Sequence, residues 1–355
     1  MSIYFLNYPE VQLYLKKIEL FKIWLEPKFV FTFLNLFMKF CEIVNLLLLN
    51  QRFEFNKNPN LSLCLGFFDG VHEGHKVVIK NAVNLARQNG LKSAVITFKD
   101  HPLCYLQGRT PQYITSLEDR LALIEQQGVD FAYVLEFDES IADYLAADYL
   151  REVLVANFEP KFITTGFNHS FGVNKQGNAE FLRSRQKEFG YKFFEIPPIT
   201  FNSTLISSTK IRQLISAGEL ENMKNLLGTP FFLRGEVREG SRIGRSISFP
   251  TANIRYPKDI LRLPKGVYFA TVEVNGKTHN SVVNIGVKPT VSDAKKLLVE
   301  AHILDFNENI YTKPVKINFL KKVRNEQCFE SINALKSRIA KDTEAARAFF
   351  EETKL

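Results

Sequence analysis

The chain has 355 residues, of which 45% are hydrophobic and 24% are charged, and this ordinary globular composition excludes collagen-like, disordered and disulfide-scaffold proteins. The 46 Lys and Arg residues exceed the 38 Asp and Glu residues, and the net charge of +8 favours anionic partners, namely nucleic acid, acidic lipid or phosphorylated metabolites, without choosing among them. The basic residues form no run of five and the four cysteines form no CxxC pair, so we expect a protein of the reducing cytoplasm without a nucleic-acid partner.

The first segment with a clear pattern is residues 29–49, which is rich in Phe and Leu. Lys39 and Glu42 interrupt it, and a charged residue in mid-membrane costs roughly 2.5–3.5 kcal/mol on insertion scales. Its apolar residues recur at helical spacing, at Phe33, Phe37, Phe40, Val44 and Leu47. We therefore expect an amphipathic helix that packs on the rest of the protein, or a partly disordered segment, and no stable membrane insertion.

Between residues 61 and 196 the pattern alternates between strands and helices. Apolar, β-branched runs predict strands over 61–66, 92–98, 131–137, 162–165 and 192–196. Helical periodicity predicts helices over 76–88, 117–127, 144–156 and 178–189, with Ser116 as an N-cap and Gly128 as a stop signal of the second. This alternation predicts an α/β domain built on a parallel sheet, of the Rossmann-like kind.

After residue 208 the pattern changes. Two short helices end near Gly228, and short strands follow over 231–236, 266–274, 281–285, 297–304 and 315–320. No helix is expected between these strands, which is typical of an antiparallel barrel or sandwich, and residues 331–352 are predicted to form a closing helix. We therefore predict an unassigned N-terminal extension (1–56), an α/β domain (57–228) and a β-barrel domain (229–355).

A first chemical cluster follows the first predicted strand. His72 and His75 are three residues apart, so on a helical turn they share a face, and Gly74 lets a phosphate approach the backbone. Imidazoles placed there can stabilise the charge of a leaving pyrophosphate. A metal site is an alternative, but a zincin has its histidines four apart and no third ligand is nearby. Two unrelated surface histidines are the other alternative.

A second anion-binding pattern precedes the short helices. Ser207 and Ser208 are natural N-caps, Thr209 is expected to begin the helix, and Arg212 lies one turn further on. Hydroxyls, backbone N–H groups and a guanidinium would then face one anion. A plain capped helix without a ligand is the alternative interpretation.

A third pattern lies in the predicted barrel. Thr251 and Asn253 are two residues apart, so on an extended segment both side chains point to the same side. A hydroxyl and an amide oxygen suit Mg²⁺ that keeps most of its shell from phosphate and water. A turn followed by a polar strand is the alternative. Residues 235–242 approach a P-loop, but they lack its lysine and no helix follows.

The string from Gly66 to His75 resembles the adenylyltransferase half of prokaryotic bifunctional riboflavin kinase/FAD synthetases. Residues 97–102 and 165–172 resemble further conserved segments of that half, and residues 206–212 resemble its second nucleotide motif. The chain departs from the family at Asp100, where proline is usual, and at His169, where phenylalanine is usual.

The Pro-Thr-Ala-Asn string at residues 250–253 resembles the Mg-ATP motif of the riboflavin kinase half. Ser248 stands where glycine is usual, and residues 266–268, 284–290 and 300–305 extend the match. By this resemblance Glu300 is the general base for the 5′-hydroxyl of riboflavin.

The resemblance, which covers residues 61–350, implies that one chain converts riboflavin to FMN and FMN to FAD, with ATP as co-substrate and Mg²⁺ as cofactor. His72, His75 and Glu300 would be catalytic, and Thr251 and Asn253 would hold the metal. The residues implied to bind nucleotide or flavin are Gly66, Phe68, Asp69, Gly74, His101, Asn168, Ser208, Thr209, Arg212, Gly244, Arg245, Thr251 and Asn253.

Three other functions stay open at this point. The chain could be a riboflavin kinase with a decayed adenylyltransferase half, for which Asp100 and His169 speak. It could be a non-catalytic flavin-binding regulator, or a nucleotidyltransferase for another phosphate ester, although the last would leave the barrel unexplained. Residues 1–56 lie outside the resemblance, either as an extension or because an upstream start was chosen and Met38 is nearer the true beginning.

Overall fold

The computed structural model describes residues 60–240, 247–287 and 297–353. The helix expected within residues 29–49 lies outside this range, and so do Gly244 and Arg245. In the part of the chain that is described, no helix combines the length and the apolar character needed to span a bilayer.

A five-stranded parallel sheet forms the first domain, in the order β3-β2-β1-β4-β5. Its strands are β1 (Leu61–Leu65), β2 (Lys92–Phe98), β3 (Phe131–Leu135), β4 (Phe162–Gly166) and β5 (Lys192–Ile196). All five residues of β1 are buried, because β1 is the central strand of a sheet covered on both faces. The chain runs outward from β1 to β3 and then returns to β4, so the strand order reverses between β1 and β4. Ligands of open α/β sheets bind at such a reversal, beyond the carboxyl ends of the strands.

Short helices and turns connect these strands. They are η2 (Asp69–Val71), α3 (Glu73–Gln88), α4 (Pro102–Gln107), α5 (Leu117–Glu125), α6 (Glu139–Ala142), α7 (Ala146–Asp148), η3 (Tyr149–Val155), α8 (Ala156–Phe158), η4 (Val173–Lys175), α9 (Ala179–Ser184), α10 (Gln186–Phe189), α11 (Ser208–Ala217) and α12 (Met223–Leu227), with the hairpin β6 (Thr200–Phe201) and β7 (Thr204–Leu205) before α11. Ser116 caps α5 as predicted, by accepting a hydrogen bond from the Asp119 N–H.

Several predicted elements differ in their extent or were missed. The helix expected over 144–156 begins at Ala146 and widens into the π-helical turns of η3, and the one expected over 178–189 is interrupted at Arg185. Leu150, Val153 and Leu154 recur three and four residues apart and are all buried, and a wider turn preserves that pattern, so periodicity does not reveal it. The helix expected over 117–127 ends at Glu125, the strand expected over 131–137 ends at Leu135, and α4 and the hairpin were not predicted.

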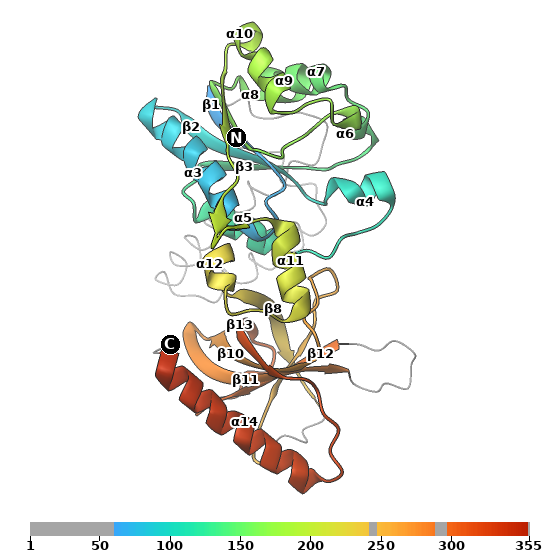
Figure 1. Cartoon of the computed structure of the whole chain (residues 1–355), viewed down its shortest axis with the longest axis vertical. Helices are drawn as coiled ribbons and strands as arrows, with labels where there is room; N and C mark the ends of the chain where they lie inside the picture. Colours follow the sequence, from blue (N-terminus) through green and yellow to red (C-terminus); the bar gives the residue numbers. More distant parts are fainter. Residues whose placement is uncertain (1–59, 241–246, 288–296, 354–355) are drawn as a thin grey trace, which may run out of the picture. The chain divides into compact units, whose positions relative to one another are not determined.

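The second domain is an antiparallel barrel, as predicted, and the structure shows that it is closed, with the strand order β10-β11-β12-β9-β8-β13. Its elements are β8 (Phe231–Arg238), β9 (Ala252–Arg255), β10 (Gly266–Val274), β11 (Lys277–Val287), β12 (Leu297–Ile303), β13 (Pro314–Arg324) and the helix α14 (Ile332–Thr353), of which β9 was not among the predicted strands. Alternate residues such as Tyr268, Ala270 and Val272 fill the interior. Figure 1 shows α14 (red) beside the barrel, and its Ala346 and Phe350 pack on the outward-facing Val267 and Phe269 of β10.

A buried ion pair fastens α14 to the barrel. Arg324, at the end of β13, donates two hydrogen bonds from Nε, at 3.2 and 3.1 Å, and one from Nη2, at 2.7 Å, to the Asp342 carboxylate. The Asp342 side chain is 3% exposed, so these hydrogen bonds replace the water that the carboxylate loses. A second pair, between Arg347 and Asp305, joins the same helix to the end of β12 but lies in solvent.

The two pairs predict unequal effects on stability. Asp342→Ala leaves the half-buried Arg324 guanidinium without its carboxylate, and we expect the free energy of unfolding to fall by about 3 kcal/mol. Asp305→Ala removes an exposed pair on the same helix and should cause a much smaller loss. Urea denaturation of both variants measures the difference, and equal losses would contradict the assignment of Asp342 as the main attachment of α14.

Candidate active sites

The first candidate site begins with a strained loop beyond the carboxyl end of β1. Phe68 and Val71 adopt positive φ angles of 59° and 40°, which residues other than glycine rarely adopt. The loop carries Gly66 and Phe68 and ends at His72, the N-cap of α3. Phe68 is buried against the sheet, and a Cβ on Gly66 would lie 2.7 Å from the Phe68 ring, so only glycine allows this close approach.

His72 and His75 come together as the sequence predicted. Nδ1 of His72 accepts a hydrogen bond of 3.1 Å from the His75 backbone N–H, and the two rings stack with their centroids 3.5 Å apart. Because Nδ1 is an acceptor, the proton of neutral His72 lies on Nε2, which is left as a donor. Gly74 lies beside the pair, and a Cβ there would lie 3.2 Å from the His72 ring.

Both imidazoles are held neutral. Burial lowers the pKa of His72 from 6.5 to about 4, and the positive charges of Arg212 and Lys76 act in the same direction. Burial also lowers the pKa of His75 well below its usual range, and the neighbouring His72 ring and the positive charge of Arg212 act in the same direction. Nδ1 of His75 is buried and has no hydrogen-bond partner among the described residues. A neutral, close-packed pair is a hydrogen-bonding surface rather than a charged one.

The carboxylate of Asp69 holds the loop of this site in place. Its carboxylate is 2% exposed and accepts hydrogen bonds from the backbone N–H groups of Ile114, at 2.9 and 3.1 Å, and Thr115, at 3.2 Å. It also accepts a 2.5 Å hydrogen bond from Nη2 of Arg212 on α11. Asp69 therefore ties the loop after β1 to two segments distant in sequence, and its oxygens are already occupied.

Helix α11 carries the second predicted anion-binding pattern and lies next to this loop. Ser207 is the N-cap, since its side chain accepts from the Lys210 N–H, so the helix begins at Ser208 and not at Thr209 as predicted. Ser208 Oγ donates to the Asp69 backbone carbonyl at 3.2 Å. In the described structure, the anion that Arg212 meets is the Asp69 carboxylate. Thr209 is exposed and has no side-chain hydrogen bond to a described residue, so its hydroxyl is open to a ligand.

One residue of this region, Arg120, was not predicted from the sequence. Arg120 is 2% exposed, and its Nη2 donates to the backbone carbonyls of Phe98, at 2.5 Å, and Lys99, at 3.1 Å. Its guanidinium lies over the Phe67 ring, 4.2 Å from the centroid, and burial lowers its pKa to about 10. Its place in the helical pattern indicates burial, because Arg120 lies one helical turn from Leu117 and from Ile124, on the apolar side of α5.

Two more predicted residues lie at this edge of the sheet. His101 caps α4, with Nδ1 accepting from the Leu103 N–H at 3.1 Å, and its ring meets Phe67 edge to face at 4.7 Å. Burial lowers the pKa of His101, and the charge of Arg212 contributes. Asn168 is exposed in the loop after β4, next to His169, whose Nε2 is buried without a described partner and whose pKa burial lowers to about 4.

The second candidate site lies on the outer face of the barrel. Residues flanking Asn253 and Glu300 point inward, so these two side chains point outward, directly opposite each other across β9 and β12. Asn284 of β11 is the next residue in the same row, and its Nδ2 lies 3.5 Å from Oε2 of Glu300. The predicted base therefore stands between two amides.

Thr251 and Asn253 line a cavity of about 400 Å³ beside the loop of residues 306–311. Nδ2 of Asn253 donates to the Thr251 carbonyl at 3.3 Å, which turns the amide oxygen away from that carbonyl. A Cβ on Gly240 would lie 2.3 Å from the same Nδ2, so the backbone at Gly240 closes tightly over the Asn253 amide.

These residues fit Mg²⁺ by their chemistry, because the hydroxyl of Thr251, the amide oxygen of Asn253 and the nearby carboxylate of Glu300 are all oxygen donors. A softer metal has less support, since no three His, Cys, Asp or Glu side chains of the described residues cluster as ligands. His72 and His75 accordingly lack a third ligand within that part of the chain.

Known proteins resemble this chain in both domains. The family model described as FAD synthetase matches residues 54–210, and the model described as riboflavin kinase matches residues 227–350. The bifunctional riboflavin kinase/FMN adenylyltransferase of Haemophilus influenzae is 37% identical over 81% of this chain and 94% of its own length. The protein of the same description from Listeria monocytogenes is 38% identical over 82% of this chain and 93% of its own.

A solved structure shares the fold of the described domains. It is a Streptococcus pneumoniae protein described as a macrolide-efflux protein, it is 30% identical to this chain, and the TM-score is 0.75. The match covers 81% of this chain and 94% of that one.

The buried histidines predict a pH dependence of stability. The folded pKa of His72, about 4, lies below the unfolded value of 6.5, so the unfolded chain binds more protons between these values. The stability contributed by neutral His72 is complete above pH 6.5 and falls, by up to about 3 kcal/mol, as the pH approaches 4. In His72→Asn, which keeps an N-cap oxygen, urea denaturation should show a shallower decline over this range. An unchanged decline would show that His72 is not held neutral.

Proposed function

The chain belongs to the family of bifunctional riboflavin kinases/FMN adenylyltransferases, and from this premise we propose that its barrel phosphorylates riboflavin to FMN and its α/β domain adenylylates FMN to FAD. The observation that carries this proposal is the separation of the two candidate sites on domains of different architecture. The neutral His72–His75 pair lies at the strand-order reversal of the parallel sheet, whereas the row of Asn253 and Glu300 lies on the barrel.

In the α/β domain, an oxygen of the FMN phosphate attacks the α-phosphorus of ATP. A new P–O bond forms, the bond between the α-phosphorus and the bridging oxygen breaks, and pyrophosphate leaves. Nε2–H of His72 donates to the departing oxygens, and His75, Ser208, Thr209 and Arg212 complete this cradle. His72 is buried, His75 is half-buried and both are neutral, so the imidazoles act through hydrogen bonds and hold no proton for transfer at pH 7.

Asp69 is a positioning residue in this scheme. Its carboxylate is fully engaged by Ile114, Thr115 and Arg212, so it holds the guanidinium and leaves none of its own hydrogen-bonding capacity for ATP. Arg120 and Phe67 lie on the same side as His101 and would form a wall beside the nucleotide or flavin. The exposed Asn168 and the half-buried His169 belong to the flavin-side loop, where His169 stands in place of the family's usual phenylalanine.

In the barrel, Glu300 accepts the proton of the riboflavin 5′-hydroxyl as its oxygen attacks the γ-phosphorus of ATP, and ADP leaves. Asn284 holds the Glu300 carboxylate, and Thr251 and Asn253 orient the terminal phosphates. Bound Mg²⁺ would supply neutralisation of the phosphate charge at Thr251 and Asn253. Gly244 and Arg245, outside the described residues, are proposed to contribute to the same nucleotide site.

The reaction needs only small molecules, namely riboflavin, FMN, FAD and ATP, and we infer no nucleic-acid partner. The cytoplasm is the proposed compartment, since the described cysteines Cys64, Cys104 and Cys328 are free thiols. A riboflavin kinase whose adenylyltransferase half has decayed is the alternative that His169 favours. The close packing of His72 and His75 and the anchoring of Arg212 by Asp69 count against it.

The two activities should be separable by mutation. Glu300→Ala removes the base, so FMN formation should fall at least about 100-fold while conversion of supplied FMN to FAD continues. His75→Ala should do the reverse, with a loss of about 100- to 1,000-fold in FAD formation. Purified protein incubated with riboflavin or FMN, ATP and Mg²⁺, with products separated by chromatography, measures both. The activity that each variant retains shows that it is folded. Equal loss of both activities in either variant would refute the modular assignment.

Asp69→Asn tests the positioning role. The amide cannot pair with Arg212 as the carboxylate does, so FAD formation should fall by about 100-fold while riboflavin phosphorylation is unchanged. Asp130→Asn is the matched control, because Asp130 also accepts from a backbone N–H and a cation, Ser93 and Lys92, but at the amino ends of β2 and β3. Pyrophosphate release gives the rate, and a normal rate in Asp69→Asn would remove Asp69 from the site.

A further inference from the structure

The groups already assigned to the FAD-forming site carry little net positive charge, although both proposed substrates carry phosphates. His72 and His75 are neutral, so they contribute hydrogen bonds and no charge. Arg212 is charged, but its Nη2 is paired with the Asp69 carboxylate. Opposite charges in a close pair largely cancel at a distance, so this pair adds little to the attraction of an anion.

Arg120 on α5 differs from these groups. It is 2% exposed, yet no Asp or Glu of the described residues forms an ion pair with it. Lys76 on α3 and Lys99 after β2, by contrast, are paired with Glu73 and Glu136. A buried guanidinium without a carboxylate is costly, because it loses hydration that no opposite charge replaces.

Three contacts hold the guanidinium of Arg120 without neutralising it. Its Nη2 donates to the carbonyls of Phe98, at 2.5 Å, and Lys99, at 3.1 Å. Its Cζ lies 4.2 Å from the centroid of the Phe67 ring, whose negative face attracts a cation. Its Nε is buried and has no hydrogen-bond partner. Two dipoles and a ring leave the full charge in place, and with a pKa of about 10 the group stays protonated at pH 7.

This charge lies close to the site. The Asp69 carboxylate, which holds Arg212, also acts on Arg120, since it opposes the lowering of the Arg120 pKa by burial. Phe67 belongs to the loop after β1, and its ring meets His101 at a centroid distance of 4.7 Å. Burial lowers the pKa of His101, and the positive charges of Arg212 and Arg120 act in the same direction. The two arginines therefore act on the same small region at the carboxyl ends of β1 and β2.

A purely structural role accounts for the hydrogen bonds of Arg120 but not for its charge. The two carbonyls could accept from a neutral donor, whose burial costs less than that of a cation. Asp100 is a further carboxylate that acts on Arg120, but it is exposed, so water and salt screen it. An uncompensated buried charge is a departure from the rules of stable packing that is typical of functional sites.

From these features we propose that Arg120 supplies the net positive charge of the FAD-forming site and thereby strengthens the binding of its phosphorylated substrates. Arg120 acts through its electric field and not by contact, since its guanidinium is buried against the Phe67 ring. The ligand class is a phosphate anion, either the triphosphate of ATP or the monophosphate of FMN. The inference rests on the proposed function, which identifies these two anions.

Steady-state kinetics of FAD formation by the full chain test this role, with pyrophosphate release as the signal. Arg120→Gln removes the charge and keeps a polar side chain. The KM for ATP or the KM for FMN should rise at least about tenfold, the effect of a unit charge roughly 10 Å from a phosphate at an effective dielectric constant near 20. The kcat should change less than about threefold, because a field that acts alike on bound substrate and transition state changes mainly KM. Varying each substrate while the other is saturating shows which phosphate is affected.

Two further variants separate charge from structure. Arg120→Lys keeps the charge but loses the planar fork, and it should return both KM values to within about threefold of the wild type. Arg183→Gln is the matched control, because Arg183 also lies over a phenylalanine ring, 5.7 Å from the Phe193 centroid, but is exposed and paired with Glu195. Its KM values should equal those of the wild type, and riboflavin phosphorylation should be unchanged in all three variants.

Wild-type KM values in Arg120→Gln, or an equal rise of KM in Arg120→Lys, would overturn the electrostatic role. A loss confined to kcat would also overturn it, since that is the result of a distorted or partly unfolded site. Failure of the proposed function appears differently, as absence of FAD formation by the wild-type chain, and it would remove this inference as well.

Discussion

The buried carboxylate of Asp69 is the interaction on which the first site depends. A carboxylate removed from water is costly unless hydrogen bonds and a counter-charge replace its hydration. Asp69 obtains both, from two backbone N–H groups of the segment before α5 and from Arg212 of α11. The same requirement therefore determines where α11 stands relative to the loop after β1, and it brings Ser208 and Arg212 to the side of His72 and His75.

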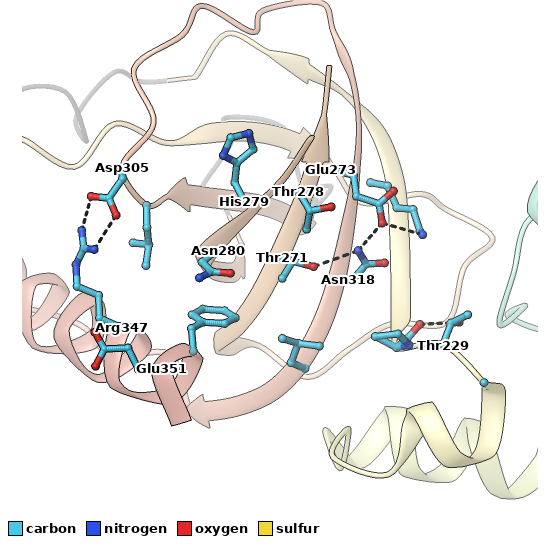
Figure 2. A pocket seen from close by; sticks show the side chains of 16 residues that line it. Thr229, Thr271, Glu273, Thr278, His279, Asn280, Asp305, Asn318, Arg347 and Glu351 are labelled. Atoms are coloured by element: carbon cyan, nitrogen blue, oxygen red, sulfur yellow. Dashed lines mark hydrogen bonds and ion pairs between the residues drawn. The ribbon is translucent and has the colours of Figure 1, made fainter. Parts of the chain in front are cut away.

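Burial has a second consequence at this site. The same low-polarity surroundings that strengthen the Asp69–Arg212 pair keep His72 and His75 neutral, so the site combines one compensated ion pair with two uncharged donors. In the barrel the chemistry is arranged differently. Strand alternation points Asn253, Glu300 and Asn284 outward while their neighbours fill the core, so the row requires no buried charge. The outer face of the same barrel also carries an uncharged row of Asn280, Thr271 and Asn318 (Figure 2).

Much of the fold could be predicted from the sequence. The central strands of the sheet and most strands of the barrel came from apolar runs and turn residues, and the change of architecture near Gly228 came from the loss of helical periodicity. The departures have physical reasons. Strand β9 has only four residues, Ala252–Arg255, too few for its alternation to be recognised, and a π-helical turn keeps the apolar spacing of an α-helix.

The sequence by itself determined which chemical groups are present and which lie close together along the chain: the His72–His75 spacing, the Ser207 cap and the Thr251–Asn253 pair are local, because helix and strand periods set the direction of neighbouring side chains. Only the tertiary structure decided that Arg212 meets Asp69, that Arg120 lies over Phe67, and that Glu300 stands between Asn253 and Asn284. These contacts join residues far apart in sequence, and they depend on strand order, register and burial, which no local pattern specifies.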